Sequence, residues 1–211
     1  MCLDPTFLID KNVYTDLIVK SNNNINYGLN DNDKYVATYF ITEDVDNMPF
    51  QSEIQDLLKN HKVINIKGEY ISSTLANLFI YNSIPKWLLL LKNCDYLITD
   101  SYHGVIFAII FEKDFVCIPK SEISATRYND LFKDLSITPT IIKNKEEIIN
   151  ILNLSIIDYS AVNIKLIQLI NKSRKFLLDS LKKDNNVNNQ KLSILMKDLS
   201  NRKSENEVLK K

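Results

Sequence analysis

Short apolar runs alternate along this chain with segments whose apolar residues recur at helical intervals. The runs are rich in β-branched and aromatic residues and are bounded by polar turn residues, which is typical of strands. The predicted strands are residues 34–41, 62–66, 96–99, 115–119 and 140–142. The predicted helices are residues 50–59, a segment through 87–92 capped by Ser83, residues 103–111 and residues 127–135.

This alternation predicts the fold class. Strands that alternate with helices of about ten residues form a parallel sheet, and both faces of such a sheet are covered. The strands are continuous apolar runs, as burial on both faces requires. We therefore expect an α/β, Rossmann-like three-layer domain with a mainly parallel sheet, followed by C-terminal helices.

The last third of the chain is predicted to be helical. A short apolar stripe lies at residues 148–152, and a longer helix extends through residue 181. Residues 184–189 are a polar linker, and the apolar residues beyond it fall at the spacing of an amphipathic helix. We predict a domain over residues 1–182 and a linker with a helical tail over 183–211. The tail is expected to pack on its own domain or a neighbour, with a partner-binding helix as the alternative.

Composition and charge exclude several classes of protein. The chain has 211 residues, of which 45% are hydrophobic, and its 26 basic residues balance its 26 acidic ones. A chain without net charge has no overall field that attracts nucleic acid or an anionic membrane, so any anion site must be local. The longest apolar run, residues 105–111, is far below the roughly 20 residues that span a bilayer.

The cysteines and the N-terminus bear on localisation. Cys2, Cys94 and Cys117 are odd in number and widely separated, and no Cys/His cluster suggests zinc. The N-terminus carries no basic region before an apolar stretch, so it does not read as a signal peptide. We expect a cytoplasmic protein with reduced thiols.

The most informative stretch for function is residues 95–104, with the sequence DYLITDSYHG. An apolar strand ends there at a polar turn, followed by His103, Gly104 and a new apolar segment. In α/β sheets ligands bind at the carboxyl ends of strands, where helix N-termini favour anions. The stretch therefore predicts an anion site, in which Gly104 allows close approach of the backbone.

The surrounding sequence resembles the polysaccharide pyruvyl transferase family. The resemblance is carried by a tryptophan-containing helix at Trp87, the DYLITDSYHG turn, an apolar helix, a second strand and a later segment, SATRY, ending at Tyr128. It extends outward to residues 3–9, 157–159 and 173–177 and covers most of residues 3–181.

The resemblance implies a fold and an activity. The family is understood to have a two-domain, glycosyltransferase-B-like architecture, of which this chain corresponds to the C-terminal half. The implied reaction transfers pyruvyl from phosphoenolpyruvate to a sugar of a bacterial surface polysaccharide, with no cofactor beyond this donor. The partners implied are the donor, a glycan acceptor and a separate N-terminal half, since the chain looks like a truncated form.

The resemblance also implies site residues. It places His103 at the active-site histidine of the family, where an imidazole can supply a proton or contact a phosphate. Arg127 can bind phosphate or carboxylate through two parallel hydrogen bonds. Lys120 follows a strand at the same edge of the predicted sheet, and Ser101 and Gly104 flank His103. We predict His103 as catalytic, the other four as substrate-binding, and His103 and Arg127 on the rim of one polar pocket.

Two other classes of protein remain open. A glycosyltransferase donor-binding domain of the same architecture would bind a nucleotide sugar and not phosphoenolpyruvate. A non-catalytic remnant or interaction module would bind neither ligand.

Overall fold

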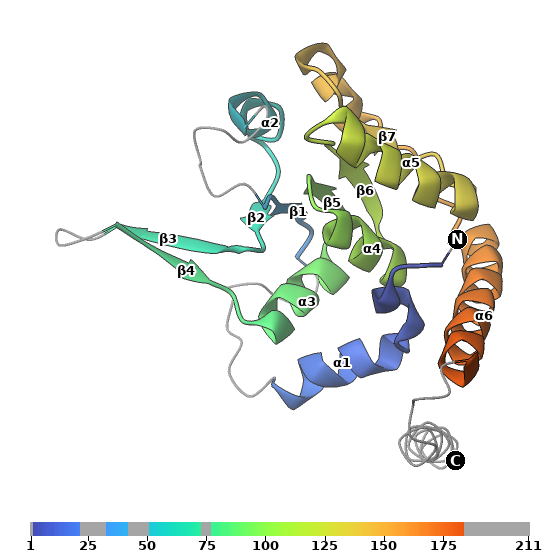
Figure 1. The fold of residues 1–211 in the computed structure, drawn as a ribbon. Helices are drawn as coiled ribbons and strands as arrows, with labels where there is room; N and C mark the ends of the chain where they lie inside the picture. The colour runs from blue at the N-terminus through green and yellow to red at the C-terminus, as the bar shows by residue number, and fades with distance from the viewer. Residues whose placement is uncertain (1, 22–32, 42–50, 73–76, 184–211) are drawn as a thin grey trace. The chain divides into compact units, whose positions relative to one another are not determined.

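The computed structural model describes residues 2–21, 33–41, 51–72 and 77–183 of the chain. Figure 1 shows a group of short strands lying between helices and a hairpin that extends away from them. The helices before and between the strands are η1 (Pro5–Leu8), α1 (Lys11–Lys20), α2 (Gln51–Leu57), α3 (Ile84–Asn93), α4 (Tyr102–Ile110) and α5 (Glu122–Leu135). The strands are β1 (Val36–Tyr39), β2 (Val63–Asn65), β3 (Gly68–Ser72), β4 (Asn77–Tyr81), β5 (Tyr96–Thr99), β6 (Asp114–Cys117) and β7 (Thr140–Ile141). The chain then forms η3 (Lys145–Leu152) and α6 (Tyr159–Lys183).

Five of the strands form one sheet in the order β2-β1-β5-β6-β7, and every neighbouring pair is parallel. This confirms the predicted α/β, Rossmann-like fold with a mainly parallel sheet. The strand order reverses between β1 and β5, because the chain first moves outward to β2 and then continues on the other side of β1. Clefts for ligands form at such reversal points, outside the carboxyl ends of the strands.

Helices cover both faces of the sheet. On one face, Ile98 and Val116 belong to a buried cluster with residues of α2 and η3, including Ile54 and Ile148. On the other face, Phe115 of β6 packs against α5, and α4 contacts both β5 and β6. Alternate residues of each strand thus point to opposite apolar layers, which explains the continuous apolar runs in the sequence.

Aromatic side chains of α1, β1, α3 and α4 pack against one another. The Trp87 ring packs edge-on against Tyr39 and Phe107, with ring centroids 5.2 and 5.1 Å away, and Phe107 packs against Tyr14 of α1. Trp87 Nε1 is buried and has no hydrogen-bond partner among the described residues. This half-buried indole belongs to the packing between helices.

The short helix η1, the β3–β4 hairpin and helix α1 were not predicted from the sequence. The β3–β4 hairpin is antiparallel and separate from the main sheet. Helix α1 precedes the first strand in the chain. Its apolar residues do not form a clear helical stripe in the sequence, since Val13 and Leu17 are exposed.

The predicted start of the fifth helix was wrong. Helix α5 begins at Glu122, after the cap Ser121, so Arg127 lies inside the helix and not at its first residue. The side chains of Ser121 and Ser124 each accept a hydrogen bond from the other's backbone N–H, and this capping box starts the helix. The apolar pattern gave a later start because buried apolar residues begin only at Tyr128.

The end of the described chain is the helix α6. Its first part, up to Ile167, belongs to the larger compact unit of residues 4–167, and the remainder belongs with residues 1–3 to a smaller unit. Within the smaller unit, the backbone N–H of Leu3 donates to the buried hydroxyl of Ser173 at 3.0 Å. The predicted linker and amphipathic tail beyond Lys183 lie outside the described residues. No helix in the described part of the chain is long and apolar enough to cross a membrane.

Candidate functional site

A hollow lies where β1, β5 and β6 end, at the reversal point of the sheet. It is open on one side and has a volume of about 160 Å³. Residues within three positions of each strand end, Ile41, Asp100 and Lys120, form part of its wall, and α4 and α5 supply the rest. The lining residues are Ile41, Asp100, Tyr102, Lys120, Ser124, Arg127 and Tyr128. The predicted strands 96–99 and 115–119 are neighbours in the sheet, as β5 and β6, although β6 ends at Cys117 and not at Pro119.

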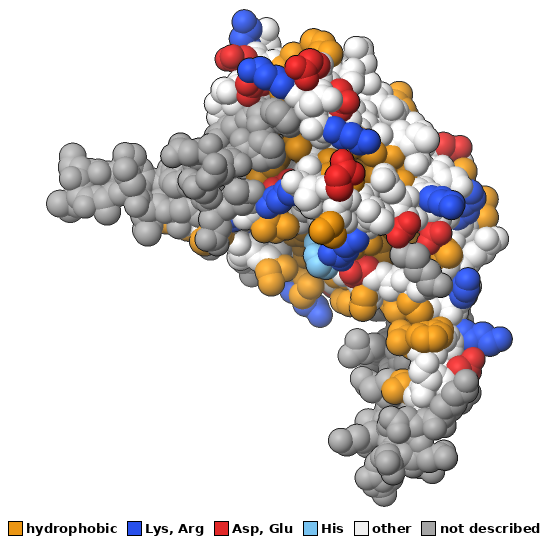
Figure 2. All heavy atoms as spheres, turned by 45° about the horizontal axis from the view of Figure 1, so that its top comes forward, with side chains coloured by type: hydrophobic (Ala, Val, Ile, Leu, Met, Phe, Trp, Pro, Cys, Tyr) orange, Lys and Arg blue, Asp and Glu red, His pale blue; other side chains and the backbone are white. Residues whose placement is uncertain are grey.

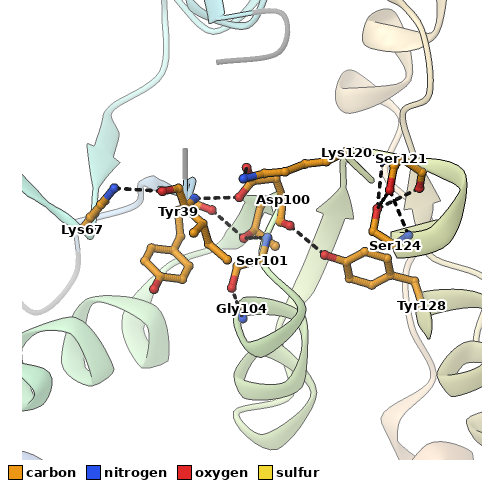
Figure 3. A network of polar contacts seen from close by, with 11 residues as sticks. Tyr39, Lys67, Asp100, Ser101, Gly104, Lys120, Ser121, Ser124 and Tyr128 are labelled. Atoms are coloured by element: carbon orange, nitrogen blue, oxygen red, sulfur yellow. Dashed lines mark hydrogen bonds and ion pairs between the residues drawn. The ribbon is translucent and has the colours of Figure 1, made fainter. Parts of the chain in front are cut away.

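Asp100 holds the floor of the hollow together (Figure 3). Its fully buried carboxylate accepts a hydrogen bond from the backbone N–H of Ile41 at 2.8 Å and forms an ion pair with Lys120 at 3.0 Å. The backbone carbonyl of Asp100 accepts a hydrogen bond from the Tyr128 hydroxyl at 2.7 Å. A buried carboxylate needs such partners, because leaving one unpaired costs several kcal/mol. Asp100 therefore fixes where Lys120 presents its charge.

Lys67 approaches the same strand ends from the turn after β2. Its ammonium group donates to the backbone carbonyl of Ile41 at 3.2 Å (Figure 3). One peptide segment after β1 is thus held by Asp100 through its N–H and by Lys67 through its C=O.

Ser101 and Gly104 form the beginning of α4. The buried hydroxyl of Ser101 accepts a hydrogen bond from the backbone N–H of Gly104 at 3.1 Å, and Ser101 is the N-cap. A Cβ atom at Gly104 would lie 2.7 Å from Thr99 Oγ1, so glycine is required there by the packing of the helix on the strand end. The close approach at Gly104 is thus to protein atoms in this structure. Contact of Ser101 or Gly104 with a substrate stays a prediction.

His103 is the second residue of α4, and 59% of its side chain is exposed. Its Nε2 lies 3.8 Å from a carboxylate oxygen of Asp4, the residue that caps η1. Asp4 lies in residues 3–9, which share the family resemblance, but it was not predicted as a site residue.

His103 does not line the hollow, which differs from the prediction that it shares a pocket with Arg127. Successive residues of a helix point about 100° apart. Tyr102 consequently faces the hollow, while His103 faces Asp4. The two rings remain neighbours, with centroids 6.2 Å apart.

Arg127 reaches the hollow from α5. Its guanidinium carbon lies 4.3 Å from the centroid of the Tyr102 ring, which is a cation–π contact. The Tyr102 ring also packs against Tyr128, with centroids 5.6 Å apart. Burial raises the pKa of the Tyr102 phenol more than the charge of Arg127 lowers it, so the phenol stays protonated at neutral pH. Tyr102 and Tyr128 were missed as site residues, although Tyr102 is the aromatic position of the turn motif.

The charges at the hollow are two cations, Lys120 and Arg127, and one carboxylate, Asp100. Because Asp100 is already paired with Lys120, the charge of Arg127 is the less compensated one. On the face drawn in Figure 2, Lys and Arg side chains lie among acidic and hydrophobic ones rather than in one patch. Any anion bound here is therefore held by local contacts. Among the described residues, no three His, Cys, Asp or Glu side chains gather as metal ligands do.

These features define a class: an α/β domain with a parallel sheet and a cationic hollow at the point where the strand order reverses. The sequence model of the polysaccharide pyruvyl transferase family matches residues 1–121. More than half of the 211 residues are matched, and the chain belongs to this family. The match includes His103, Asp100 and Lys120 and ends before Arg127. No curated protein matches the chain.

Proposed function

We propose that this protein transfers a pyruvyl group from phosphoenolpyruvate to a sugar of a bacterial surface polysaccharide. The observation that carries the proposal is the convergence of Lys120 and Arg127 on one hollow at the carboxyl ends of parallel strands, next to the helix start that bears His103. Family membership supports the reaction class. The donor, which carries a phosphate and a carboxylate, suits a site with two cations.

The reaction forms a ketal. The methylene carbon of phosphoenolpyruvate accepts a proton and becomes a methyl group, and one sugar hydroxyl adds to the central carbon. The bond from that carbon to the phosphate oxygen then breaks, and the second hydroxyl adds in place of the phosphate. The two sugar hydroxyls release two protons. One replaces the proton that the acid gave to the methylene carbon, and the other leaves with the phosphate. The chain must supply a proton donor and cations for the donor's negative groups.

We assign these roles to three side chains. Arg127 binds the phosphate or the carboxylate of the donor through its guanidinium. Lys120, held by Asp100 at 3.0 Å, supplies a second positive charge at a fixed place. His103, whose Nε2 lies 3.8 Å from a carboxylate oxygen of Asp4, serves as the general acid. Ser101 and Gly104 keep the helix start in place, and the N-terminal turn of α4 adds its partial positive charge.

Further parts of the proposal concern architecture and location. The unit of residues 4–167 corresponds to one half of a glycosyltransferase-B-like fold. The sugar acceptor approaches the open side of the hollow. We place the reaction in the cytoplasm. The free cysteines Cys94 and Cys117, both buried, support a reducing compartment.

The test measures phosphate released from phosphoenolpyruvate in the presence of a glycan acceptor. We expect His103→Ala to lower turnover by about 100-fold or more, as loss of a general acid does. The matched control is His61→Ala, which removes the other histidine, an exposed residue between α2 and β2. Lys120→Met should weaken binding of the donor.

Three outcomes would contradict the proposal. Turnover by His103→Ala equal to that of the wild type would remove the assigned role. Binding of a nucleotide sugar without binding of phosphoenolpyruvate would identify a glycosyltransferase donor domain, and binding of neither would favour a non-catalytic module.

A further inference from the structure

We propose that Tyr102 is a positioning residue, whose ring holds the Arg127 guanidinium at the hollow next to His103. The inference rests on the proposed function for the identity of the anion that Arg127 binds. Tyr102 is well placed for this role, because it directly precedes His103 in the sequence and its ring contacts both the His103 ring and the Arg127 guanidinium.

The first argument concerns what fixes Arg127. Its side chain is long, and the residue is exposed on α5. In the described part of the chain, its guanidinium forms no ion pair or hydrogen bond and contacts the face of the Tyr102 ring at 4.3 Å. Without this ring, the side chain would sample several rotamers, and ordering them would cost affinity when an anion binds. The stacked guanidinium keeps its N–H groups available at its edge, where a phosphate or carboxylate approaches.

The second argument concerns what fixes Tyr102. The residue is the first of α4, directly after the cap Ser101, so its backbone is set by the helix start. Its ring packs on Tyr128, and the Tyr128 hydroxyl donates to the buried carbonyl of Asp100 at 2.7 Å. The sheet end thus holds Tyr128, Tyr128 supports Tyr102, and Tyr102 supports Arg127.

The contact depends on the aromatic ring and not on the phenol hydroxyl, since the guanidinium lies over the ring face. Tyr102→Phe should therefore keep the affinity for phosphoenolpyruvate within about twofold of the wild type. Tyr102→Leu should weaken binding by about threefold to tenfold, the range that an exposed to partly desolvated cation–π contact gives.

The binding test is a double-mutant cycle with phosphoenolpyruvate titrated into the full chain. The variants are Tyr102→Leu, Arg127→Gln and the combination of the two, and circular dichroism checks that each is folded. If Tyr102 acts through Arg127, Tyr102→Leu weakens binding in the wild-type background and has no further effect beside Arg127→Gln. Equal effects in both backgrounds, or no effect in either, would overturn the inference while leaving the proposed function in place.

A second readout needs no ligand. The chain has three arginines, Arg127, Arg174 and Arg202, so their side-chain N–H signals can be assigned in an NMR spectrum with the variants Arg127→Gln and Arg174→Gln. The ring face should shift the Arg127 signal upfield in the wild type and in Tyr102→Phe, and Tyr102→Leu should abolish the shift. An Arg127 signal that is unchanged in Tyr102→Leu would overturn the inference. If the wild type failed to bind phosphoenolpyruvate but showed this shift, the proposed function would fail and the positioning of Arg127 would stand.

Discussion

At the scale of single residues, the end of β5 depends on one hydroxyl group. Thr99 Oγ1 donates a hydrogen bond to the carbonyl of Tyr39 at 2.6 Å and accepts one from the N–H of Ser101 at 3.0 Å. It therefore joins β1, β5 and the cap of α4. Gly104 lies against this hydroxyl, and the space for a side chain there is already occupied.

We predict that Gly104→Ala lowers the free energy of unfolding by about 1–3 kcal/mol, the usual cost of an extra methyl group in a packed site. The new Cβ would lie 2.7 Å from Thr99 Oγ1 and 3.2 Å from Tyr39 Cδ1, and Thr99 is too short and too firmly bonded to move away. Urea denaturation measures the effect. In a Thr99→Ala background the same substitution should cost less, and an undiminished cost would show that the clash lies elsewhere.

At the scale of elements, the two ends of α5 are determined by different local devices. Its start is the reciprocal pair Ser121 and Ser124. Its end is Ser136, which has a left-handed backbone with φ 53° and whose N–H donates to the carbonyl of Lys133. A left-handed residue is a common way to end a helix, and glycine is the residue that adopts it without a steric cost.

We predict that Ser136→Gly raises the free energy of unfolding by about 0.5–1 kcal/mol, because it relieves the left-handed strain at the cost of a more flexible unfolded chain. The serine hydroxyl contacts the exposed Lys165 ammonium, a contact of little energetic value at the surface. Urea denaturation at neutral pH provides the measurement. Ser136→Ala is the matched control and should give no gain, since it loses the hydroxyl and keeps the strained backbone. A gain from alanine as large as that from glycine would contradict the argument.

At the scale of the whole molecule, α2 and η3 cover one face of the sheet and are joined at the surface by an ion pair. Glu53 of α2 and Lys145 of η3 lie 2.5 Å apart. The hydrogen bond from Lys145, with further ones from the Glu53 backbone and Ser52, lowers the pKa of Glu53 from 4.5 to about 2. A carboxyl group with a lowered pKa in the folded state stabilises the fold above its unfolded pKa, and this stabilisation is lost as the pH falls through the folded pKa.

We predict that the difference in Tm between the wild type and Glu53→Gln is largest above about pH 4.5 and shrinks as the pH falls toward 2. Thermal denaturation at a series of pH values gives the profile. Asp56→Asn removes an exposed carboxylate of α2 that forms no ion pair within the described residues, so its Tm difference should depend on pH much less. A constant difference for Glu53→Gln across this range would rule out the linkage.

Local patterns predicted much of the fold. The bounds of β5 agree with the predicted strand, and α3, α4 and β6 lie within a few residues of their predicted positions. The prediction failed where burial is shallow or the signal is polar. Helix α1 exposes several apolar side chains, and the first turns of α5 are set by serine hydrogen bonds instead of an apolar face.

For the site, the sequence alone determined the motif around His103, the family and the placement of Lys120 at a neighbouring strand end, because these follow from local order and the topology of parallel sheets. Only the tertiary structure decided that Asp100 holds Lys120, that Asp4 faces His103 and that Arg127 rests on Tyr102. These contacts join residues that are distant in the chain, and they depend on which side of a helix or strand each side chain leaves. The spacing of apolar residues along a chain indicates whether a segment is a helix or a strand. Which side chains meet at the site is decided only when the helices and strands pack together.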